Sequence, residues 1–117
     1  MIAPAIIGQR SCTPGLVDVL ASVSFLPEYE GGRSTDVRMT YRPLNMFGGP
    51  ESRESWFGQI CLAPTEKISP GERLKVVIQF AASPALLAEL TPGRSWRIQE
   101  GAQLVAIATV VEVLGQP

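Results

Sequence analysis

The sequence predicts an all-β fold, an antiparallel barrel or sandwich that forms one domain. Apolar and polar residues alternate with period two in five segments, which is typical of half-buried strands. Clusters of Gly and Pro separate these segments, and a helical pattern is confined to one short stretch. At 117 residues the chain is long enough to bury one core but too short for two.

The first two strands are expected at residues 16–25 and 36–42. In the first, LVDVLASVSF, alternate residues form the apolar face: Val17, Val19, Ala21, Val23 and Phe25. In the second, DVRMTYR, the apolar positions are Val37, Met39 and Tyr41. Arg38 and Arg42 share the opposite face, so this strand is expected to have a basic outer surface.

Two further strands are expected at residues 55–62 and 73–80. In SWFGQICL, one side carries Trp56, Ile60 and Leu62, and the other carries Phe57 and Cys61. In RLKVVIQF the apolar face is formed by Leu74, Val76, Ile78 and Phe80. The segment that follows, SPALLAEL, has the one helical pattern, with Ser83 as its candidate N-cap.

The last strand, AQLVAIATVVEVL at residues 102–114, is apolar on both faces. One face is expected to carry Val105, Ile107, Val111 and Val113, and the other Leu104, Ala106, Ala108 and Val110. In a small barrel one of these faces belongs to the core. If Leu104 and Val110 point outward, the second face forms an exposed apolar patch, which predicts self-association as a homo-oligomer or a dedicated partner.

The composition argues against several classes of protein. The formal net charge is −1, without the basic excess that is typical of non-specific nucleic-acid binding. The sequence contains no histidine, which excludes Ser-His-Asp and Cys-His catalysis. Cys12 and Cys61 are interpreted as free thiols in a reducing compartment. Because no apolar run reaches the length of a membrane span, a cytoplasmic protein without a membrane partner is predicted.

Three motifs, taken in order, resemble one known domain. VSFLPEYEGGRSTDVRMTYRP begins at residue 23 and contains Glu-Gly-Gly-Arg and Tyr-Arg-Pro. KISPGERLKVVIQF follows at residues 67–80, and RSWRIQEGAQLVAIATVVEVLG covers residues 94–115. This series resembles the C-terminal, third β-barrel domain of elongation factor Tu and its relatives. The resemblance covers roughly residues 16 to 115.

The resemblance implies a six-stranded antiparallel Greek-key barrel at residues 16–117, preceded by an N-terminal extension at residues 1–15. The chain has no Gly-x-x-x-x-Gly-Lys-Ser/Thr phosphate loop and lacks the length of a GTPase domain, so GTP hydrolysis is not implied. In the family this barrel packs against neighbouring domains and contacts aminoacyl-tRNA. By the same resemblance, Arg33, Glu100 and Gly101 match positions on the tRNA-facing side, whereas Leu44 replaces a glutamine there.

The residues themselves suggest candidate binding groups. Arg33, Arg38 and Arg42 suit bidentate contacts to carboxylate or phosphate; the alternative is that they pair with Glu28, Glu30 or Asp36, or are solvated. Trp56 beside Phe57 is a candidate exposed anchor for a partner, whereas Trp96 is expected in the core. Gly31 and Gly32 are expected to supply a positive φ or a close backbone approach, with a phosphate nest as the alternative.

These observations predict a non-catalytic binding module that resembles the third domain of elongation factor Tu and binds a translation-related protein or tRNA. The alternative is a protein-interaction domain of unrelated use, such as an immunity or inhibitor protein that mimics elongation factor Tu. No catalytic residue, cofactor or metal ligand is predicted, because the acidic residues are scattered and no metal-ligand spacing occurs.

Overall fold

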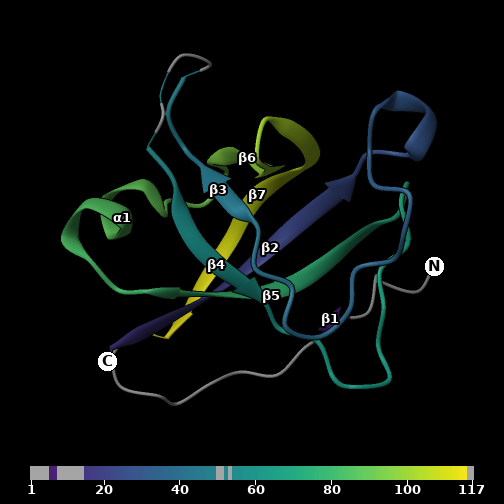
Figure 1. Ribbon diagram of the computed structural model, residues 1–117. Helices are drawn as coiled ribbons and strands as arrows, with labels where there is room; N and C mark the ends of the chain where they lie inside the picture. Colours follow the sequence, from purple (N-terminus) through teal and green to yellow (C-terminus); the bar gives the residue numbers. More distant parts are fainter. Residues whose placement is uncertain (1–5, 8–14, 50–51, 53, 116–117) are drawn as a thin grey trace.

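The computed structural model describes residues 6–7, 15–49, 52 and 54–115. The strands are β1 (Ile6–Ile7), β2 (Leu16–Phe25), β3 (Leu44–Met46), β4 (Trp56–Ile60), β5 (Arg73–Ala81), β6 (Ser95–Glu100) and β7 (Gln103–Gly115). A short 3-10 helix, η1 (Glu28–Glu30), follows β2, and an α-helix, α1 (Pro84–Glu89), follows β5 (Figure 1). The described part of the chain is therefore mostly strand, as the sequence predicts.

Six of the strands close into an antiparallel barrel. Their order is β5-β2-β7-β6-β3-β4, and β4 pairs with β5 to complete the ring. Strands β3, β4 and β5 are successive neighbours and β2 returns beside β5, which is a Greek-key arrangement. The predicted six-stranded antiparallel barrel is thus confirmed. β1, within residues 1–15, adds a parallel strand to β5 through the pairs Ile6–Lys75 and Ile7–Val76.

The contacts that hold the ring together differ greatly in length. β2 and β5 pair over nine residues, from Leu16 opposite Ala81 to Ser24 opposite Arg73. β4 and β5 pair over three, namely Gly58–Phe80, Gln59–Gln79 and Ile60–Ile78. We call this short β4–β5 contact the closing seam. Because each pair contributes ladder hydrogen bonds, the closing seam is the more weakly bonded of the two contacts.

The alternating residues of β2, β4 and β5 form a large part of the barrel core, as predicted. The core side chains that these strands contribute are Val17, Val19, Ala21, Val23, Phe25, Ile60, Val76, Ile78 and Phe80. Leu86 and Leu90, on α1 and directly after it, join the same core, so the helix covers one end of the barrel (Figure 1). Ser83 is the N-cap of α1, since its Oγ accepts a hydrogen bond of 3.2 Å from the Leu86 amide.

The strand predicted at residues 36–42 is wrong. Only Val37 forms a β-bridge there, with hydrogen bonds of 2.8 and 3.0 Å to Ile68. The chain then turns, because the Tyr41 amide donates to the Arg38 carbonyl and Thr40 takes a φ of 73°. A positive φ is unfavourable for a β-branched residue and is incompatible with an extended strand. Val37 is buried and Met39 is exposed, so these residues share no apolar face.

The two faces predicted for the last strand are correct only over residues 106–110, because β7 contains bulges on either side of this stretch. Register shifts in its pairing with β6 and β2 leave Val105 and Val111 without a directly opposite partner. A bulge inserts one residue and reverses which face the following side chains occupy. Val105 and its neighbour Ala106 are therefore both buried, and Val110 lies in the core with 2% of its surface exposed. The apolar patch that was expected if Leu104 and Val110 pointed outward therefore does not form.

A buried amide links three parts of the barrel. Asn45 on β3 is completely buried, and its Nδ2 donates to the carbonyl oxygens of Pro43 and Trp56 at 3.2 and 3.1 Å. Its Oδ1 accepts a hydrogen bond of 2.9 Å from Nε1 of Trp96, which is buried as predicted. The Trp96 ring stacks on Phe47 with 4.7 Å between ring centroids.

No helix among the described residues has the length and apolar character needed to cross a membrane.

Candidate functional site

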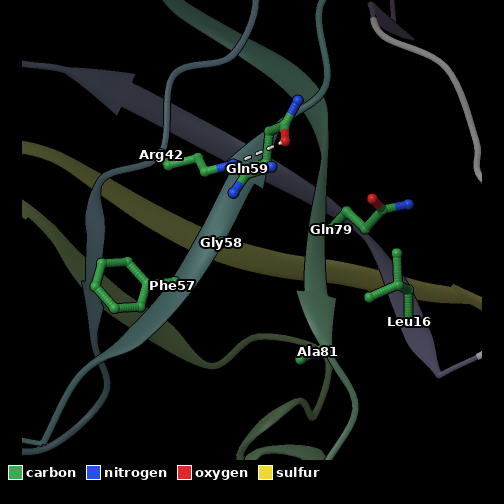
Figure 2. A pocket seen from close by; sticks show the side chains of 7 residues that line it. All are labelled: Leu16, Arg42, Phe57, Gly58, Gln59, Gln79 and Ala81. Atoms are coloured by element: carbon green, nitrogen blue, oxygen red, sulfur yellow. Dashed lines mark hydrogen bonds between the residues drawn. The ribbon is translucent and has the colours of Figure 1, made fainter.

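A shallow groove lies on the outside of the closing seam (Figure 2). It has a volume of about 230 Å³ and is lined by Leu16, Arg42, Phe57, Gly58, Gln59, Gln79 and Ala81. We call it the Phe57–Arg42 groove. Both residues are predicted binding groups, and the fold brings them together although fifteen positions separate them in the chain.

Strand alternation along β4 determines which side chains reach the groove. Ile60 points into the core, so Phe57 and Gln59, at odd-numbered positions, point outward. Phe57 is 73% exposed, which is unusual for a large apolar side chain. Gly58 lies between them on the inner side, where an added Cβ would stand 2.6 Å from Cε1 of Phe80. Glycine is therefore required for β4 to approach the core this closely.

Polar side chains line the groove together with Phe57. Nε of Arg42 donates a hydrogen bond of 3.1 Å to Oε1 of Gln59, which orients the guanidinium group along β4 (Figure 2). Nε2 of Gln79 donates to Oδ1 of Asp18 at 3.1 Å, and Asp18 is itself buried behind the groove. Among the seven lining residues, Arg42 is the single ionisable one. The groove therefore presents an aromatic ring, neutral amides and an exposed cation.

The Gly31–Gly32 turn forms as predicted at the other candidate site. Gly31 has a φ of 95°, and an added Cβ on Gly32 would stand 2.1 Å from the backbone oxygen of Leu26. Both residues thus supply the features expected of them, a positive φ and a close backbone approach. Nε2 of Gln103 donates to the carbonyl oxygens of Gly31 and Gly32 at 2.9 and 3.2 Å, which ties the turn to the β6–β7 hairpin.

Arg33 is held by a cluster that joins the first and the third of the resembling motifs. Its Nη1 forms a salt bridge with Oε2 of Glu100, and the Tyr41 hydroxyl donates to the same oxygen. The guanidinium group also lies over the Tyr41 ring, 4.8 Å from its centroid, and Nη2 donates to Oγ1 of Thr35 at 3.0 Å. The Arg33 charge is therefore largely neutralised inside the molecule.

This cluster changes the protonation equilibria of its members. Partial burial lowers the pKa of Arg33, but the hydrogen bond and charge of Glu100 outweigh it, so the pKa is raised. Burial and then the hydrogen bond to Glu100 raise the pKa of Tyr41 well above its ordinary value. Arg33 is thus a cation and Tyr41 a neutral hydrogen-bond donor over the physiological pH range.

The other predicted binding residues lie outside the groove and the Arg33 cluster. Arg38 is exposed beside Asp36 and shares no strand face with Arg42, because residues 36–42 form a turn. Trp56 is half-buried against the core, so Phe57 alone is the exposed anchor of the predicted pair. Gly101 is an exposed turn residue with a φ of 58° between β6 and β7.

Sequence reasoning missed the partners that complete both sites. The expected partners of the arginines were Glu28, Glu30 and Asp36, but the carboxylate bound to Arg33 is Glu100, 67 positions away. Gln103 and Tyr41 were not identified as members of this cluster, nor were Gln59 and Gln79 as members of the groove. The outward position of Gln59, two residues after Phe57, was the one available signal.

Cys61, the free cysteine among the described residues, has an unreactive thiol. Cys61 is half-buried, and burial, followed by the charge of Asp18, raises the pKa of its thiol to about 11. A thiol with this pKa is protonated at neutral pH and is a poor nucleophile. Cys12 lies outside the described residues. Within those residues, no cluster of Cys, Asp and Glu has the geometry of a metal site.

No protein-family model matches the sequence.

Proposed function

We propose that this chain is a non-catalytic binding module that recognises a protein partner through the Phe57–Arg42 groove. The observation that carries the proposal is the exposed Phe57 ring, 73% accessible, beside the Arg42 guanidinium. Aromatic and arginine side chains dominate the binding energy of protein interfaces because they bury a large area and make several hydrogen bonds. At about 230 Å³ the groove is smaller than the roughly 300–1,000 Å³ of small-molecule pockets, and fits a side chain.

The residue types of the chain and of the groove favour binding over catalysis. The chain contains no histidine, and the Cys61 thiol stays protonated at neutral pH because its pKa is raised to about 11. The groove carries Arg42 and two amides but neither a carboxylate nor a nucleophile in its lining. Such a set of side chains supports hydrogen bonding and ion pairing rather than proton transfer.

We further propose that the partner belongs to the translation machinery. The support is the resemblance of three ordered motifs to the third domain of elongation factor Tu, together with a closed six-stranded antiparallel barrel. Two members of those motifs, Arg33 of the first and Glu100 of the third, form a salt bridge with each other. A protein of this machinery, such as elongation factor Tu or its nucleotide-exchange factor, is favoured over tRNA because the Arg33 charge is already satisfied by Glu100.

Binding to purified components tests the proposal. Immobilised chain is exposed to elongation factor Tu, to its nucleotide-exchange factor and to aminoacyl-tRNA, and each dissociation constant is measured by biolayer interferometry. We expect a protein to bind, and Phe57→Ala to weaken that binding about tenfold or more, with Arg42→Ala acting in the same direction. Met39→Ala is the matched control, because Met39 is 44% exposed and lies outside the groove.

Two results would contradict the proposal. If the Phe57→Ala and wild-type chains bound the partner protein with equal affinity, the groove would not be part of the interface. Salt-dependent binding of aminoacyl-tRNA that Arg33→Ala abolishes, without binding of either protein, would instead support the tRNA function that the resemblance implies.

A further inference from the structure

A second exposed aromatic residue, Tyr29, lies at the end of the molecule opposite to the Phe57–Arg42 groove. Tyr29, at the centre of η1, is 86% exposed, and Glu28 and Glu30 on either side of it are exposed as well. We call these three residues the acidic knob. In the described part of the chain, neither of its carboxylates forms an ion pair. The acidic knob thus presents an unburied ring between two unpaired negative charges.

The turn holds the acidic knob in one conformation. The Glu30 and Gly32 amides donate to the Pro27 carbonyl at 3.0 Å, and the Gly31 amide donates to the Glu28 carbonyl at 3.0 Å. Because the backbone is fixed in this way, little conformational entropy remains to be lost when the knob binds. A fixed backbone beneath an exposed aromatic residue is favourable in a contact surface for this reason.

The acidic knob and the Phe57–Arg42 groove are complementary in charge and in size. Arg42 is the ionisable residue of the groove lining, and the knob offers two carboxylates. Asp18, the acid nearest the groove, is 3% exposed and accepts a hydrogen bond from Gln79, so it does not face an incoming partner. A groove of about 230 Å³ accommodates one aromatic ring stacked on Phe57.

One chain cannot bring its own two surfaces together. The groove lies at the level of Leu16 and the start of β2, whereas the acidic knob follows the end of β2 at Phe25. At about 3.3 Å per residue, the intervening strand separates them by about 30 Å. In Figure 1 the turn after β2 and the α1 end of the barrel lie on opposite sides. A contact between the two surfaces must therefore join different copies.

We propose that the acidic knob of one copy binds in the Phe57–Arg42 groove of the next, so that this chain associates head to tail. Tyr29 stacks on Phe57, and a knob carboxylate pairs with Arg42. The proposal rests on the proposed function, since it specifies an occupant of the same groove. Because the two surfaces differ, the contact is heterologous and extends into an open chain of copies or closes into a ring. A contact this small is weak, and association rises with protein concentration.

Sedimentation equilibrium over a range of protein concentrations tests the association. We expect the average mass of the wild-type chain to increase with concentration and to fall when salt is added, because the contact includes an exposed ion pair. Tyr29→Ala and Phe57→Ala should each weaken association about tenfold, while Met39→Ala has no effect. A wild-type chain that stays monomeric at millimolar concentration, or association that persists in Tyr29→Ala, overturns the proposal.

A charge-reversal experiment tests the pairing directly. Arg42→Glu and the double variant Glu28→Arg/Glu30→Arg should each fail to self-associate, because each places like charges in the contact. Mixed together they should associate, since the acidic knob of the first meets the unchanged groove of the second, and the basic knob meets the reversed groove. Failure of the mixture to associate, with both variants folded by circular dichroism, contradicts the proposal.

The two proposals fail in different ways. A separate protein bound in the groove depends on Phe57 and not on Tyr29, whereas self-association depends equally on both. A monomeric chain that still binds a translation factor through Phe57 therefore overturns the head-to-tail contact and leaves the proposed function standing.

Discussion

Asn45 illustrates how a single polar residue specifies the packing of this core. Its side-chain amide donates to the Pro43 and Trp56 carbonyls and accepts from the Trp96 indole, so both ends of the amide are satisfied although the residue is completely buried. Buried polar groups cost free energy unless they are paired, and paired ones fix the position of their neighbours. The Asn45 amide thus determines where Trp96 lies in the barrel.

Replacing Asn45 should leave those partners unsatisfied. Asn45→Ala removes three hydrogen bonds and leaves the Trp96 Nε1 and two carbonyls buried without partners, so we expect the free energy of unfolding to fall by about 2–4 kcal/mol. Urea denaturation followed by tryptophan fluorescence measures this change. Gln99→Ala, at a half-buried amide on β6, is the control and should change stability by less than about 1 kcal/mol. A loss for Asn45→Ala no greater than that of the control would contradict the expectation.

Cys61 should make stability depend on pH in the alkaline range. Its pKa is raised to about 11 in the folded chain, chiefly by burial, against an ordinary thiol pKa of about 8.5. The unfolded chain therefore loses the proton first, so the stabilisation is complete below about pH 8.5 and is lost as the pH rises towards 11. We expect the free energy of unfolding to decrease over this interval, and to decrease less in Cys61→Ala. Chemical denaturation at a series of pH values measures both slopes; parallel slopes would contradict the assignment.

The sequence around each residue predicted the burial of some side chains but not the contacts between distant ones. Trp96 was identified as a core residue because a large ring at the start of an alternating strand is usually buried. The salt bridge between Arg33 and Glu100 was not identified, because it depends on how β6 and β7 pass the turn after β2. Such a contact is a property of the closed barrel, and no local pattern around Arg33 indicates it.

At the scale of elements, alternation was a good guide to the long strands and a poor guide elsewhere. β2 and β5 were predicted within one residue, although Leu20 interrupts the polar face of β2. Residues 36–42 alternate equally well but form a turn at Thr40, and β7 departs from its predicted faces at its bulges. Bulges and positive φ values on non-glycine residues depend on the partner strands, so the sequence of one strand does not reveal them.

The turn after β2 should be intolerant of a single added methyl group. Gly32→Ala would place a Cβ 2.1 Å from the Leu26 backbone oxygen, and backbone atoms cannot move aside as a flexible side chain does. We expect a loss of about 2 kcal/mol or more in the free energy of unfolding and a weaker Arg33–Glu100 contact. Gly49→Ala is the matched control, because an added Cβ there meets no atom within 4 Å. Thermal denaturation of both variants tests this, and equal melting temperatures would contradict it.

At the scale of the whole molecule, the barrel has one extensively paired wall and several weakly paired ones, among them the closing seam and the β3–β4 contact, which has two residue pairs. The wall formed by β2 and β5 extends over nine residue pairs, whereas the closing seam has three. The antiparallel ring was predictable from the number of alternating segments and the resemblance of their order. The position of the seam was not, because it depends on which strands are neighbours around the ring and on the length of their pairing.

The Phe57–Arg42 groove spans the closing seam, with Gln59 on β4 and Gln79 on β5. Any molecule seated there touches both strands, so its binding energy also opposes local opening of the barrel. Without a partner, we expect the backbone amides of Gly58 and Gln59 to exchange with deuterium faster than those at the centre of β2. Occupancy of the groove should slow their exchange selectively, which would make mass-spectrometric exchange a sensor of partner binding even where affinity is too weak to isolate the complex.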